Sequence, residues 1–339
     1  MMSCREVLDG LKLEDSANAS LIMSRYVKEL YVKGMQGESS TRVQELRVSL
    51  FEAMKKAALK AAPLYTEAFT SRREVLAGTV TFQHAKTIQP LIAGLGSSNV
   101  LETGLTFNPT YGIPMLPGSS VKGITAHYAA GVIEPELYGL LFGHSDDKEQ
   151  EAGFMKFYDA WLVPESIKGA LVHDVMTPHH SGQEKPSDFD EPTPVRFLHV
   201  RGTFEIGIGC EDPDPKTREE WTDFVFVLIR EALKNYGIGG KTRSGYGRME
   251  LELTDAQKEL LAARKTEHGS RKDDAPAKVR VLCKKLKKNG KPDCVIIGNT
   301  GGMSVRWETV PSVSKGEEFD AVIVRTDTTS KAYILRKID

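Results

Sequence analysis

The stretch Gly237-Ile238-Gly239-Gly240-Lys241-Thr242-Arg243-Ser244-Gly245-Tyr246-Gly247-Arg248 decides how the second half of the chain folds. It follows a predicted helix over residues 217–236 and precedes strand-like alternation over residues 248–253. Its glycines let the backbone approach a ligand and expose N–H groups. Its cations suit phosphates, and a tyrosine ring can stack on a base. We therefore predict a loop that grips a nucleic-acid strand.

The elements upstream of this loop complete a βαββαβ order. The strands are predicted at residues 79–83, 154–163, 195–209 and 248–253, and the helices at residues 117–131 and 217–236. A short strand-like piece lies at residues 104–107. We expect residues 204, 206 and 208 to face the core, with Glu205 and the glycines on the other face. The order indicates an α+β protein with a ferredoxin-like fold, which RNA-recognition (RRM-like) domains share.

The chain divides into four predicted parts. They are an N-terminal helical region (1–77), the ferredoxin-like domain (78–254) with an irregular, proline-containing insertion at 174–194, a helix with linker (255–276) and a small basic β-barrel domain (277–339). The helices of the first part are expected at 16–34 and 41–76, the second interrupted at Pro63. An insertion as long as 174–194 is usually functional.

The last part is predicted to be OB-like because it contains five short strands separated by turns such as Asn289-Gly290. The strands are expected at residues 279–283, 294–298, 303–307, 319–325 and 331–336. Residues 278–339 carry a net charge of +6 and the remainder −7, which indicates either an electrostatic footprint or a solvated basic face.

Composition bounds the class of protein. The 339 residues are 40% hydrophobic and 27% charged, as in soluble globular chains. We expect no membrane partner, because no apolar run approaches the length of a bilayer span and the N-terminus lacks a signal-peptide core. The four cysteines lie far apart, which indicates a cytoplasmic setting, no disulfide framework and no cysteine metal site.

A second anion-binding motif is predicted at Pro117-Gly118-Ser119-Ser120-Val121-Lys122-Gly123, which opens the helix 117–131. A helix N-terminus presents N–H groups and partial positive charge. We expect Ser119 or Ser120 to cap the helix and to donate to a phosphate, with Lys122 adding a full charge. A plain capped helix with an exposed lysine is the alternative.

Nucleotide and metal chemistry are not expected. The glycine-rich loop follows a helix and precedes a strand, the reverse of a P-loop. His179-His180 in the insertion and His144 beside Asp146 lack metal-ligand spacing. A general base for RNA cleavage is the remaining functional reading of these histidines. Asp159 is expected to make structural hydrogen bonds at a strand end. We predict no cofactor.

Several motifs in order resemble the RAMP superfamily of CRISPR proteins. The finer match is to the sixth-subunit family of the type III-B Cmr effector complex. The motifs are Gly94-x-Gly96, Leu101-Glu102-Thr103-Gly104-Leu105, Gly112-x-Pro114-x-x-Pro117 with the helix-opening motif, Asp174 to His180, Pro192-x-Pro194-Val195-x-Phe197-Leu198 and the glycine-rich loop. Together they cover about residues 78 to 254.

This resemblance implies a non-catalytic subunit of an antiviral RNA-guided complex. Its partners would be guide RNA, target RNA, other RAMP backbone subunits and small helical subunits. The insertion 174–194 would be the thumb-like segment, and the chain would lie toward the 3′ end of the guide. The implied RNA-binding residues are Gly118, Ser119, Ser120, Lys122, Gly239, Gly240, Lys241, Arg243, Ser244, Tyr246, Arg248, His179 and His180.

Two other readings stay open. One is a metal-independent endoribonuclease that processes CRISPR transcripts, with His144, His179 or His180 as general base. The other is a protein-interaction scaffold whose C-terminal barrel binds a partner subunit. The lysine-rich stretch 284–291 in that barrel fits either a nucleic-acid finger or a solubilising turn.

Overall fold

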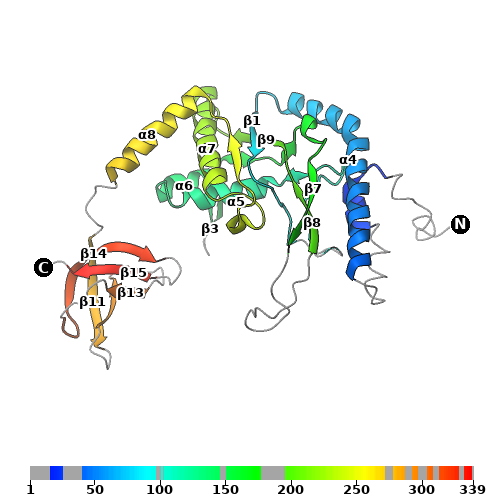
Figure 1. Ribbon diagram of the computed structural model, residues 1–339. Helices are drawn as coiled ribbons and strands as arrows, with labels where there is room; N and C mark the ends of the chain where they lie inside the picture. The colour runs from blue at the N-terminus through cyan, green and yellow to red at the C-terminus, as the bar shows by residue number, and fades with distance from the viewer. Residues whose placement is uncertain are drawn as a thin grey trace. The chain divides into compact units, whose positions relative to one another are not determined.

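A computed structural model of the 339-residue chain separates it into two compact units, Met1–Leu261 and Ala262–Asp339. Figure 1 shows the elements of both units. The structure describes residues 16–25, 40–96, 101, 103–145, 150–176, 195–271, 278–286, 292–296, 304–307, 313–327 and 332–337. Among these residues, no helix combines the length and the apolarity needed to cross a bilayer.

The first unit is built on an antiparallel sheet with the strand order β10-β1-β9-β6-β2, and β5 pairs with β9 beside it. The strands are β1 Val80–Thr87, β2 Met115–Leu116, β5 Met155–Phe157, β6 Ala160–Leu162, β9 Thr203–Cys210 and β10 Met249–Leu251. Strand β1 runs along β9 from Val80 opposite Gly209 to Lys86 opposite Thr203. The sheet therefore brings together strands from both halves of this unit.

Three helices accompany this sheet: α5 Gly118–Ala129, α6 Pro135–Phe142 and α7 Pro215–Asn235. Helix α7 confirms the predicted helix 217–236. Its N-cap Asp214 accepts a hydrogen bond from the N–H of Thr217 at 2.8 Å. Phe204, Ile206 and Ile208 are fully buried, as predicted from the alternation of β9. Glu205, on the opposite face of the same strand, is buried as well.

Helix α4, Ser40–Leu76, runs beside the two-stranded hairpin of β7, Leu171–Met176, and β8, Val195–Val200 (Figure 1). The predicted interruption at Pro63 is wrong, because α4 continues through this proline. Packing along the helix outweighs the lost hydrogen bond: Tyr65 is buried and its hydroxyl donates to the Leu162 carbonyl at 2.7 Å. Of the predicted helix 16–34, the structure describes α2, Ala19–Arg25.

Two predicted strands are each split. Residues 195–209 form β8 and β9, which belong to different sheets, and the break falls at Gly202, where φ is +147°. Residues 154–163 form β5 and β6, which are separated by Tyr158 and Asp159. A hydrophobic pattern that continues across a bend cannot reveal the bend, because apolar side chains are buried on both sides of it.

Other boundaries also differ from the prediction. Asp174 lies in β7 rather than in an irregular insertion, and residues 177–194 fall outside the described residues. Residues 104–107 contribute an isolated bridge from Phe107 to Pro114 instead of a strand. Helix α6 and the hairpin of β3, Gly143–Ser145, with β4, Gln150–Ala152, were not predicted.

The second unit contains a five-stranded sheet with the order β12-β11-β14-β15-β13. Strands β13 and β15 pair in parallel, and the other pairings are antiparallel. The five predicted strands are confirmed, as β11 Lys278–Leu286, β12 Pro292–Ile296, β13 Ser304–Trp307, β14 Glu318–Asp327 and β15 Ala332–Lys337. Helix α8, Asp255–Arg271, precedes them in the chain.

Candidate nucleic-acid interface

The glycine-rich loop is held by main-chain hydrogen bonds to the segment that follows β1. The N–H of Gly240 donates to the carbonyl oxygen of Ile92 at 2.7 Å. The N–H of Gly247 donates to the carbonyl oxygen of Pro90, also at 2.7 Å. The N–H of Ile238 donates to Gly247 at 2.9 Å and closes the loop on itself. These N–H groups serve the fold, which corrects the expectation that the glycines expose them to a ligand.

Close backbone packing explains why glycines occupy these positions. Gly239 has a φ of +88°, and a Cβ on it would lie 2.3 Å from the Ile92 carbonyl oxygen. A Cβ on Gly247, whose φ is +78°, would lie 2.0 Å from the carbonyl oxygen of Ile238. Real Cβ atoms do not approach backbone oxygens this closely, so a side chain here would displace the clamped backbone.

The centre of the loop is its exposed part. Lys241 adopts a left-handed conformation with a φ of 57°, and a short 3-10 helix, η3 Thr242–Ser244, follows it. Arg243 and Ser244 are exposed, and Lys241 is half-buried. This arch, residues 241–245, presents two cations and a hydroxyl to solvent from a backbone that is fixed on both sides.

Tyr246 joins the loop to the β7–β8 hairpin. Its hydroxyl donates to Oδ2 of Asp174 at 2.8 Å, and its ring centroid lies 6.2 Å from that of Phe197. Burial and this bond raise the pKa of Tyr246. Burial alone would raise the pKa of Asp174, but hydrogen bonds from the Val175 N–H and from Tyr246, with nearby positive charge, hold the pKa below its ordinary value. The ring therefore packs against Phe197 within the protein, and its stacking on a base stays a prediction.

Arg248, the last residue of the loop, has an intramolecular partner. Its guanidinium donates to the carbonyl of Lys234 in the last turn of α7. A cation at this position satisfies a helix carbonyl and complements the helix dipole. Its predicted contact with phosphate stays a prediction.

The helix-opening motif is also built differently from the prediction. The N-cap residue of α5 is Pro117, which makes no side-chain capping bond, so the expected cap by Ser119 or Ser120 is wrong. Asp159 replaces that cap: its Oδ1 accepts the N–H of Gly118 at 2.8 Å. The expectation that Asp159 makes a structural hydrogen bond is thereby confirmed. Ser119 and Ser120 are exposed, and Lys122 is half-buried.

The structure sets the two predicted motifs toward different ends of α5. Tyr236, which directly precedes the glycine-rich loop, packs its ring against His127 and Tyr128 in the last turn of α5, at centroid distances of 5.1 and 6.1 Å. Gly118 begins the same helix, about 14 Å away along its axis at the usual rise per residue. The arch and the helix-opening motif are therefore best treated as separate candidate contacts.

Of the three histidines that the sequence singled out, the structure describes one, His144. His179 and His180 lie outside the described residues. His144 lies in β3, opposite Glu151 of β4. Within the part of the chain that the structure describes, no group of three or more histidine, cysteine or acidic residues could hold a metal ion.

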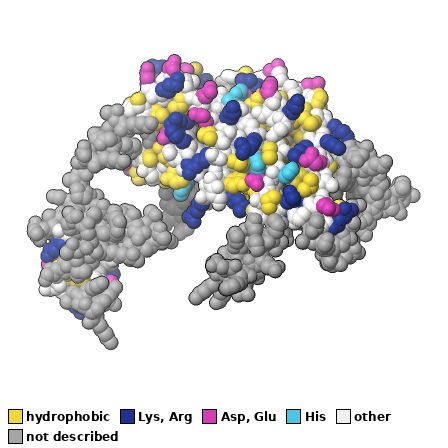
Figure 2. Space-filling view, in the orientation of Figure 1, with side chains coloured by type: hydrophobic (Ala, Val, Ile, Leu, Met, Phe, Trp, Pro, Cys, Tyr) yellow, Lys and Arg dark blue, Asp and Glu magenta, His cyan; other side chains and the backbone are white. Residues whose placement is uncertain are grey.

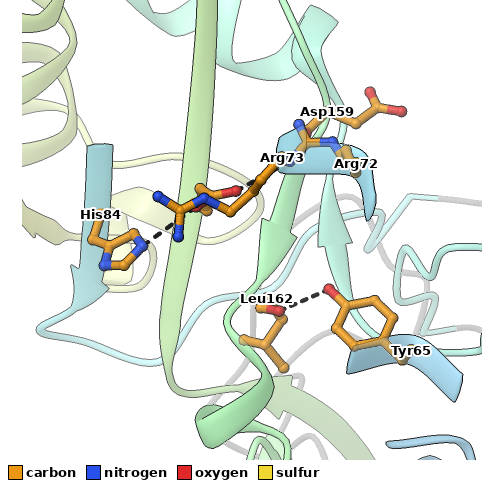
Figure 3. A network of polar contacts seen from close by, with 7 residues as sticks. Tyr65, Arg72, Arg73, His84, Asp159 and Leu162 are labelled. Atoms are coloured by element: carbon orange, nitrogen blue, oxygen red, sulfur yellow. Dashed lines mark hydrogen bonds and ion pairs between the residues drawn. The ribbon is translucent and has the colours of Figure 1, made fainter. Parts of the chain in front are cut away.

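An ion network centred on the buried carboxylate of Glu205 joins the end of α4 to the sheet (Figure 3). The carboxylate of Glu205 lies 3.3 Å from Nη1 of Arg72, 3.2 Å from Nε of Arg73 and 3.5 Å from Nε2 of His84. The guanidinium of Arg72 also donates to the carbonyl of Asp159 at 2.9 Å. This network fixes α4 on the sheet, and sequence reasoning missed it.

Charge on the visible face of the first unit is mixed. Figure 2 shows lysine and arginine side chains spread among acidic and apolar ones. Sequence reasoning also missed Arg201, an exposed cation in the turn between β8 and β9. No signal in the sequence pointed to Arg201, because the β7–β8 hairpin that it follows was not predicted.

The model of the RAMP superfamily matches residues 84–250, from β1 to β10. The curated relatives point to one branch: the CRISPR system Cmr subunit Cmr6 of Pyrococcus furiosus is 26% identical over 297 residues, covering 68% of this chain and 82% of its own. The chain is a Cmr6-like RAMP protein. The matched range contains both the helix-opening motif and the glycine-rich loop.

Two further similarities accompany this Cmr6-like assignment. The Cmr6 subunit of Saccharolobus solfataricus is 26% identical over 155 residues, which are 45% of this chain and 50% of that protein. One chain of the cryo-EM structure of the Type III-B Cmr-beta bound to cognate target RNA aligns with a TM-score of 0.49 and 21% identity, covering 73% of this chain and 93% of that one.

Proposed function

We propose that this Cmr6-like chain is a guide-RNA-binding structural subunit of a type III-B RNA-guided effector complex. The observation that carries the proposal is the arch of residues 241–245, whose two cations stand on a backbone clamped to residues 90–92. A rigid cationic arch binds phosphates without reading bases, because its contacts go to the backbone of the strand. Binding should therefore be largely independent of RNA sequence.

Two finer fold assignments belong to this proposal. We propose that β1, α5, β6, β9, α7 and β10 form a ferredoxin-like domain, because β1 and β9 lie in the centre of the sheet, flanked by β10 and β6. We propose that the second unit is OB-like, since β11 pairs with both β12 and β14 while β13 and β15 pair in parallel. The division at residues 77, 254 and 276 belongs to the same proposal.

We propose the partners that the resemblance to Cmr subunits implies. The chain would bind guide RNA near its 3′ end, meet target RNA, and assemble in the cytoplasm with other RAMP backbone subunits and small helical subunits. The proposed RNA-binding set keeps Gly118, Ser119, Ser120, Lys122, Gly239, Gly240, Lys241, Arg243, Ser244, Tyr246, Arg248, His179 and His180. Within it, Lys241 and Arg243 should supply most of the electrostatic affinity.

The test is the salt dependence of RNA binding. The affinity of the full chain for a fluorescently labelled single-stranded RNA is measured by anisotropy across a series of KCl concentrations. Lys241→Ala with Arg243→Ala should flatten the slope of log affinity against log salt by about 1.4, or ~0.7 for each lost contact with single-stranded RNA. Lys56→Ala, which removes an exposed cation of α4, is the matched control. A double variant with the wild-type slope would refute the proposed site.

We propose that the subunit is non-catalytic. Incubation of the purified chain with a CRISPR repeat RNA in the presence of a chelator should leave the RNA intact. Specific cleavage that is lost in a His144→Ala or a His179→Ala, His180→Ala variant would instead establish the endoribonuclease reading.

A further inference from the structure

The arch has a neighbour that the sequence did not reveal. Tyr246 ties the loop to the β7–β8 hairpin through its hydrogen bond with Asp174, at 2.8 Å, and through its ring contact with Phe197. Asp174 and Phe197 are directly opposite each other in the hairpin register, so both side chains lie on the same face of the hairpin. The loop therefore rests on one defined face of a second chain segment.

Arg201 lies at this junction. It follows β8, and its N–H donates to the Ala170 carbonyl at 2.9 Å, which fixes its backbone at the base of the hairpin. Its side chain is exposed. Val200, the residue before it, exchanges backbone hydrogen bonds with Leu91, and the adjacent Ile92 carbonyl accepts the N–H of Gly240, so Arg201 follows a strand that is bonded to the same segment as the arch.

We propose that the RNA-binding surface is composite: Arg201 of the hairpin joins Lys241 and Arg243 of the arch, and the bond between Tyr246 and Asp174 holds the two segments in register. The inference rests on the proposed function, because it extends the same site. The ligand is the phosphate backbone of single-stranded RNA. Arg201 contacts phosphate directly, whereas Tyr246 and Asp174 are positioning residues.

The carboxylate of Asp174 repels phosphates, so its place beside an RNA-binding surface needs a structural reason. Its hydrogen bond with the Tyr246 hydroxyl, which we call the lock, supplies that reason. The carboxylate accepts hydrogen bonds from the Val175 N–H and from Tyr246, both at 2.8 Å, and it is only partly exposed. A lock of this kind fixes the spacing between hairpin and arch cations, and fixed spacing improves binding because less order has to be imposed when the strand binds.

Two substitutions of equal charge isolate the lock. Asp174→Asn keeps an oxygen that can accept the Tyr246 hydroxyl, and Asp174→Ala does not; both remove the negative charge. Affinity for the labelled single-stranded RNA should be ~3- to 10-fold weaker in the alanine variant than in the asparagine variant. Tyr246→Phe should weaken affinity for the RNA by a similar factor relative to wild type. The double variant Tyr246→Phe, Asp174→Ala should lose no more affinity than either single variant, because both changes remove the same hydrogen bond.

Arg201→Ala tests the hairpin cation. It should reduce the salt slope by ~0.7, while the Lys56→Ala control keeps the wild-type slope. Tyr246→Phe should lower affinity with little change in slope, because no charge is lost. Thermal melting of every variant confirms that the comparison is between folded proteins, and the conservative phenylalanine and asparagine changes keep the test available if Asp174→Ala does not fold.

The outcomes separate this inference from the proposed function. The composite surface is wrong, and the arch binds RNA alone, if the Lys241→Ala, Arg243→Ala chain shows the predicted reduction in slope while Arg201→Ala keeps the wild-type slope and the two Asp174 variants have equal affinities. If the arch variant itself binds like wild type, the proposed function fails first. A reduced slope in Arg201→Ala together with the predicted difference between the Asp174 variants supports the composite surface.

Discussion

Oε1 of Glu205 lies 3.3 Å from Nη1 of Arg72, and the carboxylate is completely buried in the middle of β9. The side chain of Arg72 is only 12% exposed, and its guanidinium carbon lies 5.0 and 5.1 Å from the ring centroids of Phe82 and Trp161. Burial lowers the pKa of Arg72, and the charge of Glu205 opposes that effect. This pair joins the end of α4 to the sheet.

Arg72→Ala should therefore lower the free energy of unfolding more than Arg73→Ala does. Arg72→Ala leaves a buried carboxylate without its most buried partner and should lower the free energy of unfolding by about 3–5 kcal/mol. Arg73 is the matched control: it forms an ion pair with the same carboxylate, but its side chain is 52% exposed. Arg73→Ala should cost less than about 1 kcal/mol. Urea unfolding measures both, and equal losses would contradict this ranking.

Two glycines of α5 should respond in opposite directions to alanine. A Cβ on Gly118 would lie 2.2 Å from the carbonyl oxygen of Phe157, so Gly118→Ala should destabilise the protein by about 1–3 kcal/mol. A Cβ on Gly123 meets nothing within 4 Å, so Gly123→Ala should stabilise the helix by ~0.5–1 kcal/mol. Denaturant midpoints test both changes. A tolerated Gly118→Ala would show that β5 can move away from α5.

Acid should weaken the first unit through His199. Burial lowers the pKa of this histidine, Arg201 and His173 act in the same direction, and Asp174 opposes them. The folded state therefore favours the neutral ring. Its contribution to stability is complete above about pH 6.5, the ordinary value, and is lost as pH falls from there toward the folded pKa. The check is the urea midpoint between pH 8 and pH 5.

A matched pair on the hairpin isolates this effect. His199→Gln should flatten the fall in the urea midpoint between pH 8 and pH 5. Val172→Ala, at the position paired with His199, should lower stability at every pH without changing the slope. An unaltered pH profile in His199→Gln would assign the acid sensitivity to another group.

The second unit should be separable. In a chain ending at residue 276, the first unit should have a free energy of unfolding within about 0.5 kcal/mol of its value in the full protein, because each unit is compact by itself. The truncation also removes a segment of net charge +6. An unchanged RNA salt slope would place RNA binding in the first unit. A shallower slope would assign phosphate contacts to the basic barrel, and failed assembly with intact RNA binding would favour the scaffold reading.

The periodicity of apolar residues predicted those strands and helices whose formation depends on neighbouring residues in the sequence. The strands of the second unit were predicted because alternating side chains are separated by glycine turns, and α7 was predicted because its apolar residues recur at helical spacing. The split of residues 195–209 was not predicted, because the bend at Gly202 depends on tertiary packing. Pro63 was expected to break a helix, and burial of the surrounding face overrides that local preference.

The sequence predicted which loop forms the candidate site, but not the contacts that hold this loop in place. The sequence placed cations and glycines in one loop, which identified the arch. It held no signal that Tyr246 would meet Asp174, 72 positions earlier, or that Gly239 would press against Ile92. Such contacts depend on how distant segments pack, so the spacing of residues along the chain does not report them.

The clamp between Gly240 and Ile92 joins residues roughly 150 positions apart. Closing so long a stretch is entropically costly and tends to come late in folding. On the ribosome, the glycine-rich loop can therefore take its final form only after Gly240 and Gly247 have emerged from the exit tunnel. An incomplete nascent chain would lack the geometry for binding, and premature capture of nucleic acid during synthesis would be disfavoured.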